Sequence, residues 1–154
     1  MKIDQILSPD STFCNLELSS KKKILEKVSQ VMADSIDGSS QEIFESLFAR
    51  ERLGTTALGH GIAIPHGRIK DCQQAMAVFI LLDTPVDYDA PDGQNVDIIF
   101  AILVPEQADS EQLKCLAEIA KVLSEPSLIS QIRHAHCSDA LYQIIDQASE
   151  KAPG

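Results

Sequence analysis

The chain has 154 residues, of which 44% are hydrophobic and 23% charged, a balance typical of globular proteins and unlike that of disordered or fibrous ones. Its formal net charge of −10 at pH 7 would repel a nucleic acid backbone, so we exclude DNA and RNA as partners. The basic run Lys21–Lys23 is interpreted as the solvated start of a helix. This length predicts a single domain over residues 1–150 and a frayed tail at 151–154.

Cofactor, metal and membrane signals are missing from the sequence. No P-loop or dinucleotide-binding fingerprint occurs, and the cysteines have no C-x-x-C spacing, so we predict reduced thiols, no metal and no cofactor. The first residues lack an apolar signal segment, and no apolar run is long enough to span a bilayer. We therefore expect a cytoplasmic protein without membrane insertion.

Two amphipathic helices are predicted in the first third of the chain. Ser20 precedes an apolar face at helical spacing, which predicts a helix over about 20–35. Ser39, with Glu42 three residues on, has the pattern of a capping box at the start of the second helix. Gly54 marks the expected end of that helix.

Three strand-like stretches occupy the middle of the chain. They are Ile62–Ile64, Ala75–Leu82 and Val96–Val104, and the last two are joined by the turn-rich Asp89–Gly93. Val96–Val104 is almost continuously apolar, which predicts a central strand covered on both faces.

Three further helices are predicted after these strands. The first begins at Asp109-Ser110 and is broken by Pro126, the second covers Ser127–Arg133, and the third runs from a cap at Ser138 through Ile145. Helices before and after the strands indicate an α/β fold in which a sheet is covered on both faces.

His66 is the candidate for chemistry. It lies in the run Leu58–Gly67, where Ile62–Ile64 predicts a short buried strand and Pro65 ends it, so the imidazole is presented at the strand end. Glycines on both sides, Gly67 among them, let backbone amides approach an anion. The setting suits a phosphoryl group accepted by a neutral imidazole nitrogen; the alternative is a turn histidine without chemistry.

Three more side chains are candidates for holding a phosphoryl group. Arg50 lies at the end of the second predicted helix, and its forked guanidinium suits phosphoryl oxygens. Thr55 and Thr56 follow Gly54 and offer hydroxyl donors, although threonines in such turns are also common local caps. Of the remaining histidines, His60 is interpreted as an exposed loop residue, and His134 and His136, in a polar C-terminal stretch, as residues that bind no metal.

The string Glu51-x6-Leu58-Gly59-x2-Ile62-Ala-Ile-Pro-His66-Gly67 resembles the active-site signature of the fructose/mannitol-type enzyme IIA domains of the bacterial phosphoenolpyruvate-dependent phosphotransferase system. Arg50–Thr56 and Asp97–Pro105 resemble the nitrogen-related branch of that family, whose members are stand-alone proteins. The resemblance implies a single-domain, three-layer α/β sandwich with a mixed β-sheet flanked by helices. It also implies phosphorylation of His66 on Nε2 and a phosphate-stabilising role for Arg50.

The function implied by this resemblance is that of a phosphocarrier in a nitrogen-related phosphotransferase system. His66 would accept a phosphoryl group from an HPr-type (NPr) phosphohistidine protein, and its phosphorylation state would regulate target proteins that the sequence does not identify. Two alternatives remain open. One is a sugar-specific component that passes the group to a fructose or mannitol IIB domain, and the other is a regulatory binding module that is not phosphorylated.

One position departs from the family pattern. Many family members carry a second histidine at the start of the helix after the Leu-Val-Pro strand, where this chain has Gln112. A glutamine amide can donate a hydrogen bond to a phosphoryl oxygen but cannot carry a proton. We therefore expect Gln112 to contribute to phosphate binding without any acid–base role.

Overall fold

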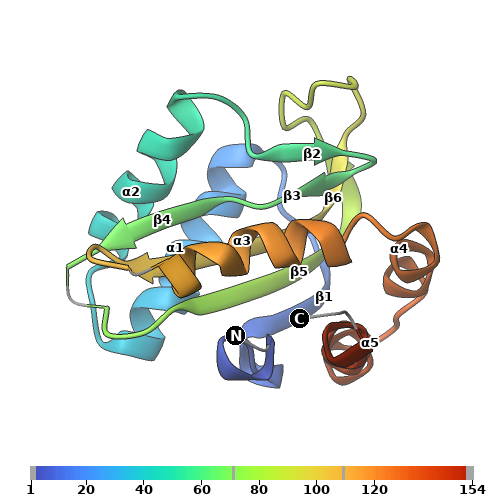
Figure 1. Ribbon diagram of the computed structural model, residues 1–154. Coiled ribbons are helices and arrows are strands. Elements are labelled where there is room, and N and C mark those ends of the chain that lie inside the picture. Colours follow the sequence, from blue (N-terminus) through green and yellow to red (C-terminus); the bar gives the residue numbers. More distant parts are fainter. Residues whose placement is uncertain (1–2, 71, 109, 152–154) are drawn as a thin grey trace.

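A computed structural model describes residues 3–70, 72–108 and 110–151, except for the side chains of residues 111–113, 150 and 151 (Figure 1). The tail expected at 151–154 lies outside the described residues apart from the backbone of Lys151. In chain order the elements are η1 (Ile3–Gln5), η2 (Pro9–Ser11), β1 (Thr12–Leu16), α1 (Lys21–Ile36), α2 (Ser40–Arg52), β2 (Ala57–Gly59), β3 (Ile62–Ala63), β4 (His66–Ile69), β5 (Met76–Val86), β6 (Val96–Pro105), α3 (Ser110–Val122), α4 (Pro126–Arg133) and α5 (Ser138–Lys151).

Within the described residues the strands form one six-stranded mixed sheet. Its main path has the order β1-β5-β6-β3-β2, and β4 also pairs with β6. β5 and β6 are antiparallel, whereas β1 runs parallel to β5, and β3 and β4 run parallel to β6. β6 is therefore the central strand, as its continuous apolar sequence predicts.

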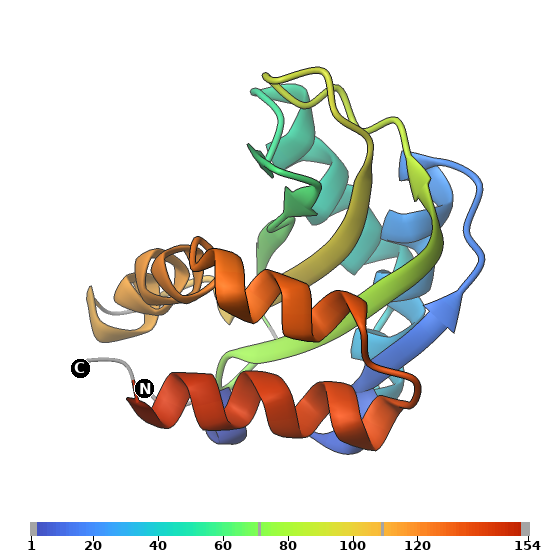
Figure 2. The same cartoon turned by 90° about the vertical axis from the view of Figure 1, so that its right-hand side faces the viewer.

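Two hydrophobic cores lie on opposite faces of this sheet, because successive side chains of a strand point to opposite sides. Phe100 and Ile102 of β6 belong to the core shared with α3, α4 and α5, whereas Ile99 and Ala101 belong to the core shared with α1 and α2. Figure 2 shows the two helical layers on either side of the strands. The predicted three-layer α/β sandwich is confirmed.

The helix starts follow from their capping residues. The hydroxyls of Ser20 and Ser39 each accept a hydrogen bond from the backbone amide three residues on, at 3.2 and 3.3 Å, before α1 and α2. At α5 the cap differs from the prediction, because Sγ of Cys137 accepts from the amide of Ala140 at 3.4 Å and Ser138 is already helical. Across the described ranges, every helix falls short of the length and apolar character that a bilayer crossing requires.

Two short strands, β1 and β2, were not predicted from the sequence. In β1, Asn15 adopts a positive φ of 61°, and the pairing with β5 shifts register between Cys14 and Leu16. In β2, Leu58 is exposed between buried neighbours, and only three residues are extended. Runs this short and irregular carry too few alternations to be distinguished from loops.

The setting of His66 differs from the prediction. We expected Pro65 to end a strand, yet pairing with β6 resumes directly after it: Ile62 is opposite Ile98 in β3, and His66 is opposite Ile102 in β4. Proline has no amide to donate, but its carbonyl accepts from the amide of Ile102 at 2.9 Å, so β6 keeps its partner there. His66 is therefore the first residue of a resumed strand rather than the last of a finished one.

Candidate functional site

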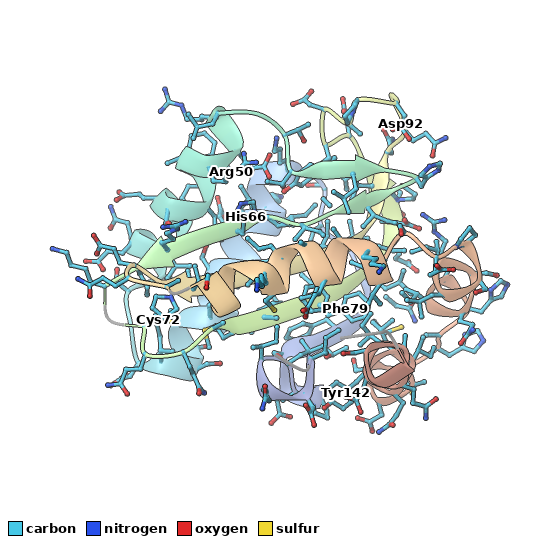
Figure 3. The ribbon with its side chains drawn as sticks, in the orientation of Figure 1. Arg50, His66, Cys72, Phe79, Asp92 and Tyr142 are labelled. Carbon is cyan, nitrogen blue, oxygen red and sulfur yellow. The ribbon has the colours of Figure 1, made fainter. Side chains whose placement is uncertain are left out.

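Arg50 and His66, the two principal residues predicted from the sequence, meet in the structure. Arg50 comes from the last turns of α2 and His66 from the start of β4 (Figure 3). Nε of Arg50 donates to Nε2 of His66 at 3.2 Å, and Nη1 of Arg50 donates to the carbonyl of Gly54 at 2.8 Å. The guanidinium is thus held at the imidazole by a second contact with the backbone.

The hydrogen bonds of His66 define its tautomer. Nδ1 lies 3.0 Å from the carbonyl oxygen of Ile64. A carbonyl can only accept, so Nδ1 carries the proton, and Nε2 of the neutral ring keeps its lone pair. The same assignment follows from Arg50, which can only donate to Nε2. Nε2 is therefore the nitrogen equipped to act as a nucleophile.

The pKa of His66 lies below its ordinary value of 6.5. Burial is the largest cause, because it disfavours the charged ring, and the positive charges of Arg50 and Arg68 lower the pKa further. The hydrogen bond to Ile64 and the charge of Glu51 act in the opposite direction. The ring is therefore neutral at neutral pH, which is the form a nucleophilic imidazole requires.

Gly67 allows α2 to lie close against β4. A Cβ added at this position would lie 2.7 Å from Oγ of Ser46 and 3.3 Å from the amide nitrogen of Leu47. Ser46 in turn joins the two elements, because its Oγ donates to the carbonyl of Arg68 at 2.9 Å and accepts from the amide of Arg68 at 2.8 Å. Ser46 lies one helical turn before Arg50, so this close contact sets the distance from Arg50 to the imidazole. A contact of the Gly67 amide with an anion stays a prediction.

The turn between β2 and β3 depends on left-handed backbone conformations. His60 has a φ of 58° and Gly61 a φ of 82°, and the turn is held from outside the hairpin. Asp92 accepts from the amide of His60 at 2.8 Å, while Arg133 donates to the carbonyl of His60 at 2.7 Å and pairs with Asp97 at 2.9 Å. These contacts fix the hairpin that leads into the strand of the site.

Thr55 and Thr56 have partners within the protein. The amide and the hydroxyl of Thr56 both donate to the carboxylate of Glu51. The hydroxyl of Thr55 donates to the carbonyl of Tyr88 at 3.1 Å. The two threonines therefore shape the loop between α2 and β2, and a direct part for either in phosphate binding stays a prediction.

Sequence reasoning missed a buried polar cluster beside this loop. The carboxylate of Glu51 also accepts from the hydroxyl of Tyr88 at 3.1 Å and lies 2.9 Å from Nζ of Lys21. Lys22 and Lys23 are exposed, as expected of a solvated helix start, but the Lys21 ammonium is directed to Glu51. Glu51 is the first residue of the signature that contains His66, so the sequence pointed to Glu51 itself. Its bonding partners could not be identified from the neighbouring sequence.

Gln112 belongs to α3, but its side chain is not among the described ones, so its contribution to the site stays a prediction. His60 is exposed, as expected, and His134 and His136 are exposed as well. In the ranges that the structure describes, no three histidine, cysteine or acidic side chains are grouped as metal ligands.

Large apolar side chains are exposed on the elements around Arg50. Phe48 of α2 is 43% exposed, Leu58 of β2 is 47% exposed, and Leu53, next to the glycine that holds Arg50, is 86% exposed. Exposed apolar side chains mark a protein contact where they form one patch, and these three are the candidates for such a patch.

Known proteins resemble this chain in sequence and in structure. The family described as "Phosphoenolpyruvate-dependent sugar phosphotransferase system, EIIA 2" matches residues 5–148. A nitrogen regulatory protein of Pseudomonas aeruginosa is 42% identical over 146 residues, which cover 94% of this chain and 95% of that protein. The crystal structure of nitrogen regulatory protein IIA-Ntr from Neisseria meningitidis superposes with a TM-score of 0.87 at 38% identity, over 93% of this chain and 98% of that one. IIA mannitol from Escherichia coli shares the fold, with a TM-score of 0.74 at 17% identity over 90% and 98% of the two chains.

Proposed function

Because the chain belongs to the EIIA 2 family of the phosphoenolpyruvate-dependent sugar phosphotransferase system and is similar to its nitrogen regulatory members, we propose that it is a phosphocarrier. His66 accepts a phosphoryl group on Nε2 from the phosphohistidine of an HPr-type (NPr) protein. The observation that carries the proposal is the arrangement of the ring: Nδ1–H is bound to Ile64, and Nε2 holds a lone pair beside Arg50.

The transfer follows from these contacts. The Nε2 lone pair of His66 attacks phosphorus, the P–N bond of the donor breaks, and its electron pair returns to the donor imidazole. The proton stays on Nδ1, hydrogen-bonded to the Ile64 carbonyl, so His66 loses no proton to solvent. As the new bond forms, the Arg50 guanidinium leaves Nε2 for the phosphoryl oxygens, where charge-assisted hydrogen bonds stabilise the added negative charge.

The exposed apolar side chains support a protein as the phosphoryl donor. Phe48, Leu53 and Leu58 offer apolar area on α2, its C-terminal end and β2. A donor docked there would bring its phosphohistidine to the imidazole of His66. A phosphoryl group adds negative charge to this surface, which is enough to create or abolish contacts with regulated target proteins.

The regulatory role is favoured over the sugar-specific alternative by the 42% identity to a nitrogen regulatory protein along almost the whole chain. The Arg50–His66 hydrogen bond favours a phosphorylated protein over a binding module without phosphorylation, since a ring used only for packing would need no cation at Nε2.

Reconstitution with phosphoenolpyruvate, an enzyme I-type protein and an HPr-type protein tests the proposal. We expect one phosphoryl group on His66, retained when a fructose or mannitol IIB domain is added. Rapid passage of the group to the IIB domain would instead support the sugar-specific role. If the protein stays unlabelled although the donor is active, the remaining interpretation is a regulatory binding module that is not phosphorylated.

A further inference from the structure

The carboxylate of Glu51 joins three segments of the chain beneath the site. Its side chain is only 2% exposed, and it lies 2.9 Å from Nζ of Lys21, at the start of α1. Tyr88, in the loop after β5, donates its hydroxyl at 3.1 Å, and Thr56 donates both its hydroxyl and its amide. Burial raises the pKa of Tyr88, which keeps its hydroxyl protonated as a donor. A carboxylate removed from water is tolerated only with such a complete set of partners.

Both hydrogen bonds to the imidazole lead back to the loop of residues 54–56. Arg50, which donates to Nε2, is held by Gly54, whose carbonyl accepts from Nη1 at 2.8 Å. Ile64, whose carbonyl accepts from Nδ1, is held by Thr56, whose carbonyl accepts from the Ile64 amide at 3.0 Å. A shift of this loop therefore displaces both partners of the ring together.

We propose that Glu51 is a positioning residue for His66: by holding Thr56, it sets the imidazole tautomer and the place of the Arg50 guanidinium. The inference rests on the proposed function, in which Nε2 of His66 accepts the phosphoryl group. Glu51 acts through the 54–56 loop. Its charge adds a smaller effect, since it raises the pKa of His66 against the two neighbouring arginines.

Two substitutions test this role, with one control on the same helix. Glu51→Gln keeps the size of the side chain but replaces one acceptor oxygen with a donor amide. Thr56→Val removes the hydroxyl that donates to Glu51, whereas Thr56→Ser restores it. Glu45→Gln makes the same chemical change as Glu51→Gln at an exposed position of α2, where Glu45 accepts a hydrogen bond from Nε2 of Gln41 at 3.3 Å.

The first measurement is the tautomer of His66 in the unphosphorylated protein, obtained from the 15N shifts of its ring nitrogens. We expect the Nδ1–H form alone in the parent protein, Glu45→Gln and Thr56→Ser, and a mixture of both tautomers in Glu51→Gln and Thr56→Val. The second measurement is the initial rate of phosphorylation by the HPr-type donor. We expect a loss of between about tenfold and a hundredfold in the two disrupted variants, because misplacing a reacting group by about 1 Å costs on the order of 10²-fold.

Folded Glu51→Gln and Thr56→Val proteins that keep the Nδ1–H tautomer and the parental rate would overturn the proposal. If Glu51→Gln does not fold, the Thr56→Val and Thr56→Ser pair decides the question alone, because these substitutions leave the buried charge and its lysine in place. The tautomer is read without any phosphoryl donor. Failure of the parent protein to accept a phosphoryl group would therefore overturn the proposed function without hiding the effect of Glu51 on the ring.

Discussion

Nε of Arg50 lies 3.2 Å from Nε2 of His66, so the cation expected to hold the phosphoryl group already covers the lone pair that would attack it. Under the proposed function, phosphorylation would exchange one hydrogen bond for others: the guanidinium would give up the ring nitrogen and bind the incoming phosphoryl oxygens. The 2.8 Å contact of Nη1 with the carbonyl of Gly54 does not involve the ring, so it would hold Arg50 at the site during this exchange.

Arg50→Ala tests the value of this cation. We expect transfer to His66 to slow by at least tenfold, since hydrogen bonds to charged groups contribute about 1.5–3 kcal/mol. The pKa of His66 should rise, because the charge of Arg50 lowers it in the parent protein. Phosphorylation rates and an NMR titration of the ring measure the two effects. Arg52→Ala, at an exposed position of the same helix, is the control, and an equal effect of both substitutions would contradict a specific role for Arg50.

His66→Gln should abolish phosphorylation, because the nucleophilic nitrogen is removed. The adduct of the parent protein should be labile in acid and stable in base, as expected of a phosphoimidazole. Mass spectrometry of the labelled protein locates it. His60→Gln is the matched control, since His60 is exposed in the preceding hairpin and its backbone, rather than its ring, makes the contacts of the turn. Labelling of His66→Gln would show that another residue is the acceptor.

Gly67→Ala should separate α2 from β4. The added methyl would meet Oγ of Ser46 at 2.7 Å, and crowding of this kind costs about 1–3 kcal/mol of folding free energy. Phosphorylation should slow as well, because Arg50 is displaced from the imidazole. Chemical denaturation and transfer rates measure these losses. Gly38→Ala is the comparison, since its methyl would meet only the flexible end of Ile36 at 3.1 Å, and a similar loss there would refute the packing argument.

The lowered pKa of His66 predicts a pH dependence of stability with a definite sign. In the unfolded chain the ring binds a proton near pH 6.5, whereas in the folded protein it does so only at lower pH. The favourable contribution of the neutral, buried ring is therefore complete above the unfolded pKa and is lost as pH falls through the folded pKa. Between about pH 7.5 and pH 5.5 the parent protein should lose more stability than His66→Gln. Equal losses in denaturation experiments would mean that the ring titrates normally.

Gln112→Ala should weaken phosphorylation by a few-fold, the effect of about 1 kcal/mol from a single hydrogen bond. His66 lies two residues from Ile64, which packs in the core shared with α3, so the helix that carries Gln112 covers this face of the sheet. Gln112→His should change the rate little except near the histidine pKa of about 6.5, where glutamine does not titrate. Overlapping pH–rate profiles for the parent and Gln112→Ala would place residue 112 outside the site.

Local signals in the sequence were sufficient for most of the fold. Apolar faces at helical spacing and the caps at Ser20 and Ser39 predicted α1 and α2, and the apolar run of β6 predicted the central strand. The prediction failed for strands whose extended conformation depends on pairing with a neighbouring strand rather than on their own residues. β4 begins with His66 and contains Gly67, a composition with no strand preference, and it is extended because β6 offers it a continuing ladder.

The candidate site could be predicted only in part, because some of its contacts join residues that are far apart in the sequence. Arg50 and His66 were recognisable from residue type and spacing, and the structure joins them by a hydrogen bond. The partners of Glu51 come from Lys21 and Tyr88, 30 and 37 positions away in the sequence, and only the folded chain brings them together. A lysine in a basic run is normally solvated, so composition alone pointed away from this contact.

The ladder that continues across Pro65 restricts the number of residues between Ile62 and His66. Ile62 and His66 meet β6 in one uninterrupted register, opposite Ile98 and Ile102, so β3 and β4 are two halves of a single ladder. Side chains alternate along it, and gaining or losing one residue in this interval would turn the imidazole to the other face of the sheet. An insertion or a deletion of one residue in this interval would therefore remove the imidazole from Arg50 as surely as a substitution of the histidine itself.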